Sequence, residues 1–144
     1  MTSYETIFKC FLRKIHDREL ARQMEFNPEF VQEDLIGYLH SAVAKTGYLD
    51  RTGITFDDDN LMIEEDLSDL EIEMYALGIE VEWLTPLVMR RTNIAQMFTG
   101  KESQFFSQAS HLNTIKELLQ ECKVEIIKIK RNHHYEHNAY IDEA

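Results

Sequence analysis

The 144-residue chain contains only two Pro, five Gly and two Cys. An all-β domain needs a turn about every dozen residues, so this shortage of turn formers disfavours one. Cys10 and Cys122 lack CxxC spacing and fall in apolar stripes, which predicts buried thiols in a reducing compartment. No apolar run reaches the ~18–20 residues of a membrane span, and residues 1–5 lack a signal peptide's basic and apolar regions. We therefore expect one domain in the cytoplasm, without membrane contact.

The motifs of common catalytic and metal sites are also missing. There is no G-x-S-x-G, G-x-G-x-x-G or Walker sequence. Asp57-Asp58-Asp59-Asn60 lacks the central Gly and the twelfth-position Glu of a calcium-binding EF-hand loop. His133, His134 and His137 have no carboxylate of the HExxH kind between them. We expect no enzymatic activity, no cofactor and no resident metal ion.

Apolar periodicity predicts an all-α fold, a bundle of about four helices. The first begins after Thr2 or Ser3 as N-cap and places Tyr4, Phe8 and Phe11 on one face. Asn27-Pro28-Glu29 is a start signal for a second helix, which ends before Gly47. The irregular residues 46–67 that follow hold an acidic loop, with apolar triplets on either side of Asp57-Asp58-Asp59-Asn60 that would allow a small hairpin.

Two further helices complete the bundle. Ser68-Asp69-Leu70-Glu71 is a capping box that opens a helix with two apolar stripes, so this helix should be central, with Glu73 and Glu80 on a narrow polar edge. The last helix runs from about residue 102 to at least residue 131. Its apolar stripe of about 25 residues implies a length of roughly 37 Å, so one end should protrude or pack on another subunit. We predict a single helical domain over residues 1–131 and a C-terminal arm over 132–144.

The charge of the chain is concentrated in one segment. Residues 50–73, the acidic segment, hold ten carboxylates and a single base, Arg51, which gives −9 of the net charge of −11. Such a surface repels nucleic acid. We expect its central part, the acidic loop, to face a lumen or a partner through Asp57, Asp58, Asp59, Glu64, Glu65 and Asp66.

The order of elements is similar to that of the head–tail connector (adaptor) proteins of tailed bacteriophages. The resemblance covers about residues 28–131. It rests on Asp34-Leu35-x-x-Tyr38-Leu39-x-x-Ala42-Val43, the acidic loop, a helix over residues 70–88 with Trp83 before a proline, and Phe105-Phe106-Ser107-Gln108-Ala109 in the long last helix. The helix expected over residues 3–24 is a departure, since the smallest connectors lack it, so other neck proteins remain alternatives.

The resemblance implies a structural protein of the virion neck, assembled in the host cytoplasm. It would form a homo-oligomeric ring, expected to be twelve-fold, between the portal protein and the next neck or tail protein. DNA would pass through without specific binding, along a wall that the acidic loop makes repellent. The end of the last helix and the arm would contact the portal or a neighbouring subunit through Lys128, Lys130, Arg131, His133, His134, Tyr135 and Tyr140.

A second class of function fits the same composition. A small helical acidic binding protein or regulator would use the acidic segment to mimic nucleic acid on a basic partner. Light scattering separates the two classes, because a ring protein associates into a large species and a mimic stays small.

Overall fold

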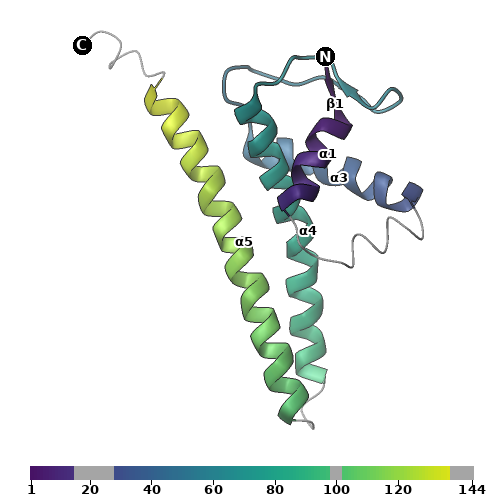
Figure 1. The fold of residues 1–144 in the computed structure, drawn as a ribbon, viewed down its shortest axis with the longest axis vertical. Coiled ribbons are helices and arrows are strands. Elements are labelled where there is room, and N and C mark those ends of the chain that lie inside the picture. Colours follow the sequence, from purple (N-terminus) through teal and green to yellow (C-terminus); the bar gives the residue numbers. More distant parts are fainter. Residues whose placement is uncertain (15–27, 98–101, 137–144) are drawn as a thin grey trace.

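The computed structural model of the chain describes residues 1–14, 28–97 and 102–136, and these are mostly helical (Figure 1). The predicted all-α bundle of about four helices is confirmed. The helices are α1 (Tyr4–Lys14), α3 (Pro28–Thr46), α4 (Asp69–Met97) and α5 (Glu102–Glu136). Three two-residue strands form a small sheet: β1 (Thr2–Ser3), β2 (Phe56–Asp57) and β3 (Met62–Ile63).

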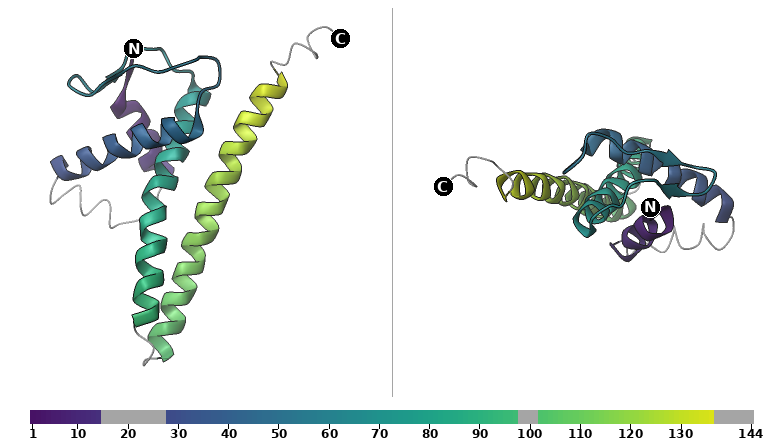
Figure 2. Two further views of the ribbon diagram at one scale, coloured as in Figure 1. Left: turned by 180° about the vertical axis from the view of Figure 1, so that it is seen from behind. Right: turned by 90° about the horizontal axis from the view of Figure 1, so that it is seen from above.

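Helix α4 is the centre of the fold, as its two apolar stripes predicted. Helices α1, α3 and α5 each pack against it, and it buries Met74, Tyr75, Ala76 and Ile79 completely. The helices α4 and α5 form a long antiparallel pair (Figures 1 and 2). Helices α1 and α3 and the sheet surround the N-terminal half of α4 and make a head, from which the rest of the pair projects.

The predicted helix signals act as expected. The Oγ atom of Ser3 accepts the amide of Glu5 at 3.2 Å. Helix α3 begins at Pro28 and ends at Thr46, and Gly47 follows with φ of 77°, the left-handed conformation that commonly terminates a helix. The capping box is present at the start of α4: the amide of Glu71 donates to Ser68 Oγ at 3.2 Å, and the Ser68 amide donates to the Glu71 carboxylate at 3.1 Å.

The small hairpin that the sequence allowed is present and is part of a larger sheet. The strands lie in the order β1-β3-β2, and all neighbours are antiparallel. Ile63, fully buried, faces Thr2 of β1 and Phe56 of β2. The sheet therefore attaches the acidic loop to the N-terminal end of the chain.

One sequence-based expectation is corrected by the structure. Glu80 does not lie on a polar edge of α4: it is only 3 % exposed, and it faces α5, where it hydrogen-bonds to the thiol of Cys122. Helix α5, expected to reach at least residue 131, runs from Glu102 to Glu136. Near this end of α5, His133 Nε2 lies 2.6 Å from Asp50 Oδ1.

Candidate functional site

The tip of the acidic loop is fixed to the head by its own carboxylates. Asp57 accepts hydrogen bonds from the backbone amide and the side chain of Asn60, at 3.1 and 2.8 Å. Asp58 accepts the hydroxyl of Tyr4 in α1 at 2.5 Å and contacts Nε2 of His40 in α3 at 2.9 Å. Hydrogen bonds from Tyr4 and His40 lower the pKa of Asp58, so its carboxylate stays ionised while it joins the hairpin to two helices.

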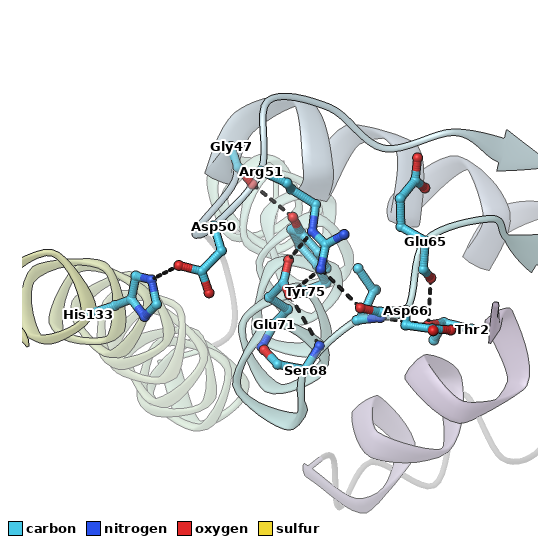
Figure 3. Close-up of polar contacts among 11 residues, drawn as sticks. Thr2, Gly47, Asp50, Arg51, Glu65, Asp66, Ser68, Glu71, Tyr75 and His133 are labelled. Carbon is cyan, nitrogen blue, oxygen red and sulfur yellow. Dashed lines mark hydrogen bonds and ion pairs between the residues drawn. The ribbon is translucent and has the colours of Figure 1, made fainter. Parts of the chain in front are cut away.

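At its base the acidic segment is held by Arg51. The Nε and Nη2 atoms of Arg51 each lie 2.7 Å from one oxygen of Glu71, and Nη2 also donates to the carbonyl of Asp66 at 3.0 Å (Figure 3). Burial raises the pKa of Glu71, but hydrogen bonds from Arg51 and Ser68 outweigh it and hold that pKa below its ordinary value. The one base of the segment therefore neutralises its one buried carboxylate.

Most of the remaining carboxylates also have partners within the chain. Glu65 accepts the amide of Thr55 at 2.8 Å, Asp66 pairs with the amino group of Met1, Glu73 pairs with Lys14, and Asp50 binds His133. Figure 3 shows Asp50 turned toward His133 of α5. Of the ten, Asp59, Glu64 and Asp69 are exposed and make no side-chain hydrogen bond or ion pair with another described residue.

The six predicted residues of the acidic loop thus divide into two groups. Asp57, Asp58, Glu65 and Asp66 hold the loop in place, and their hydrogen-bond and ion-pair partners lower the pKa of each. Asp59 and Glu64 point their charge at solvent. Sequence counting could not separate the groups, because Asp58 and Asp66 bind groups that are distant in sequence: Tyr4, His40 and the amino group of Met1.

A second surface lies on the other side of the head, between α5 and the end of α3. Two adjoining pockets of about 570 and 360 Å³ meet at Ile127 and Lys130, which line both. We call this surface the basic groove. Its principal lining residues are Lys45, Tyr48, Lys123, Ile127, Lys130 and Arg131.

The basic side chains of the groove differ in whether they already bind another group of the chain. Lys130 Nζ donates to the carbonyl of Thr46 at 2.6 Å, and Lys45 pairs with Glu82 at 2.7 Å. Lys123 and Arg131 are exposed and form no ion pair within the part of the chain that the structure describes. The groove is therefore a cationic site in a chain of net charge −11.

The residues predicted for a portal or subunit contact are partly brought together here. Lys130, Arg131, His133 and His134 line the groove. Lys128 lies outside it, 3.7 Å from Glu125, and Tyr135 is 68 % exposed. Tyr140 is outside the described residues. Sequence analysis missed Lys45, although the last turn of α3, where Lys45 lies, is a position that favours a cation.

The described residues also bear on metal binding and on membrane insertion. It contains no group of three or more His, Cys, Asp and Glu side chains arranged to hold a metal ion. None of its helices combines the length and the hydropathy that a membrane span requires. Searches with models of protein families, among curated proteins and among solved structures found no match.

Proposed function

We propose that the chain is a structural component of a phage neck, an adaptor ring beneath the portal that joins head to tail and lets DNA pass. The observation that carries the proposal is the surface of α5. One face of this helix packs on α4 through Ile115, Cys122 and Ile126. Leu118, Val124, Ile127 and Tyr135 are exposed instead. A helix that exposes apolar side chains outside its packed face offers surface for a protein–protein contact.

The two charged surfaces support the same proposal. A closed ring needs heterologous contacts, in which one face of a subunit meets a different face of its neighbour. The hairpin and the basic groove are two such faces, and they lie on opposite sides of the head (Figures 1 and 2).

Deletion of the gene in its phage tests the proposal. We expect filled heads and free tails that fail to join, and expression of the chain from a plasmid should restore complete particles. In restored particles the chain should be present in the same copy number as the portal protein. Complete infectious particles without the chain would contradict the proposal.

An acidic protein that binds a basic partner remains the second candidate. The exposed carboxylates Asp59, Glu64 and Asp69 favour it, since each is open to a cation. Seven of the ten carboxylates of the acidic segment count against it, because they already bind groups of this chain. This candidate requires a small discrete species in light scattering and a complex with a cationic protein that weakens steeply with salt.

A further inference from the structure

We infer that copies of this chain bind one another head to tail, with the exposed acidic edge of the hairpin in one copy seated in the basic groove of the next. The acidic edge consists of Asp59 in the hairpin turn and Glu64 directly after β3. This inference rests on the proposed ring and specifies which surfaces form its subunit contact.

Charge complementarity is the first argument. The groove offers Lys123 and Arg131, and the edge offers Asp59 and Glu64; none of the four has an ionic partner among the described residues. Glu82 at the groove is paired with Lys45, and Asp50 is hydrogen-bonded to His133. The cations Lys123, Lys130 and Arg131 outnumber the Asp50 carboxylate. The groove therefore keeps its positive charge available for an outside carboxylate.

The dimensions of the two surfaces also correspond. Lys123 and Arg131 are eight residues apart on one helix, which separates their backbones by about 12 Å. Asp59 and Glu64 are five residues apart, at most roughly 16 Å for an extended chain. The two spans are thus of the same order. Between them, Ile127 is 53 % exposed and Tyr48 39 %, so the contact would also cover apolar surface.

The architecture requires the occupant to come from another molecule. The hairpin lies on the side of the head away from α5 in every view (Figures 1 and 2). A chain cannot place its own hairpin in its own groove without unfolding the sheet that holds Thr2 and Phe56 to Ile63. Each copy therefore carries the hairpin on one side and the groove on the other. It can join two neighbours at once, whereas an isologous contact joins only two copies.

Paired charge reversals test the inference on the full chain. The groove variant is Lys123→Glu with Arg131→Glu, and the edge variant is Asp59→Lys with Glu64→Lys. Sedimentation velocity over a range of concentrations measures self-association. Each variant alone should raise the dissociation constant at least about tenfold, since like charges then face each other. Wild-type association should weaken with salt.

Mixing the two variants supplies the decisive result. In an alternating arrangement every groove meets an edge of opposite charge, so the equimolar mixture should recover association, as should a chain that carries all four changes. Two control variants carry equal charge changes on exposed positions outside the groove: Lys9→Glu with Lys116→Glu, and Glu117→Lys with Glu121→Lys. Neither control should alter association, and circular dichroism should show that all variants are folded.

Several outcomes would overturn the inference. These are a wild-type chain that stays monomeric at every concentration, a mixture of folded variants that fails to recover, and controls that weaken association as much as the test variants. Short duplex DNA that binds the wild type and the edge variant but not the groove variant would show that the groove takes phosphates instead. Groove variants that still yield complete particles would contradict this contact and leave the neck proposal standing. Complete particles after gene deletion would contradict the neck proposal alone, because the mixing result does not depend on it.

Discussion

Arg51 holds Glu71 through two hydrogen bonds of 2.7 Å, one from Nε and one from Nη2. Glu71 is only 1 % exposed, and its carboxylate also accepts the amide of Ser68 at the start of α4. Arg51 in turn donates to the carbonyl of Asp66. A single buried carboxylate thus caps the central helix and fixes the acidic segment to it.

Removal of the arginine should be strongly destabilising. Arg51→Met leaves the Glu71 charge buried without a counter-ion, and breaking such a pair costs about 3 to 5 kcal/mol. Urea denaturation followed by circular dichroism measures the change in the free energy of unfolding. Ser68→Ala is the matched control, because it removes the cap but keeps the ion pair and should cost only about 1 kcal/mol.

The double change Arg51→Met with Glu71→Gln separates charge from packing. Glutamine still serves a capping box, and it leaves no buried charge, so the double variant should be more stable than Arg51→Met alone. Equal losses for Arg51→Met and Ser68→Ala would show that the ion pair contributes nothing beyond the cap.

The stability of the fold should fall in acid. The pKa of Glu71 lies below its ordinary 4.5, because the hydrogen bonds from Arg51 and Ser68 outweigh the raising effect of burial. The pKa of Asp58 lies below 3.8 through hydrogen bonds from Tyr4 and His40. Lowered values mean that both groups stabilise the fold fully above pH 4.5 and lose that contribution as the pH falls through their folded-state pKa.

Urea titrations from pH 6 down to pH 2 (roughly the range over which carboxyl groups protonate) measure this loss. The free energy of unfolding should decline steadily below about pH 4.5. Asp58→Asn should flatten the curve, whereas Asp59→Asn, at a residue with no partner among those described, should leave its slope unchanged. An identical slope in Asp58→Asn would contradict the role given to Asp58.

Local signals in the sequence identified where the helices begin. Strand pairing and the burial of Glu80 depend on long-range contacts, which local signals do not record. Pro28 and the capping box at Ser68 marked helix starts correctly, since each acts within one turn. The pairing of β1 with β3 joins Thr2 to Ile63, and no local pattern records it. Glu80 was misplaced because helical periodicity predicts which residues share a face, but not that a polar residue on a packed face finds a partner.

The candidate site was predictable only in part for the same reason. Counting charges found the acidic segment, but the partners that bind Asp58 and Glu71 lie outside any local motif. The basic groove combines Lys45 of α3 with Lys123 and Arg131 of α5. Lys45 is more than 75 positions from the two α5 residues in the sequence, and only the packing of α5 beside the end of α3 brings them together.

Both thiols should react slowly in the folded protein. Burial, with a smaller effect of the Glu80 charge, raises the pKa of Cys122 to about 12. Burial and a hydrogen bond to Glu73 raise that of Cys10. The thiolate is the reactive form. At pH 8 an aromatic disulfide reagent should therefore modify both thiols slowly in the folded protein. In urea it should modify both within the mixing time. Rapid modification of Cys122 in the native protein would show that α5 separates readily from α4.

The crossing of α3 and α4 should be intolerant of added volume. A Cβ atom at Gly78 would lie 2.8 Å from the Cβ and 3.4 Å from the Cα of Ala42, which is 1 % exposed. Alanine is favoured over glycine in helices by about 1 kcal/mol, but overpacking costs about 1 to 3 kcal/mol. We therefore expect Gly78→Ala to lower the free energy of unfolding, and Ala42→Gly in the same chain to recover part of the loss.

Gly37 is the matched control for this change. It lies inside α3, and a Cβ added there meets no described atom within 4 Å. Gly37→Ala should therefore raise the free energy of unfolding by about 0.5 to 1 kcal/mol through helix propensity and the reduced freedom of the unfolded chain. Thermal and urea denaturation of both variants gives opposite signs if α3 and α4 touch at Gly78. Stabilisation by both substitutions would show that the two helices do not approach each other closely at this point.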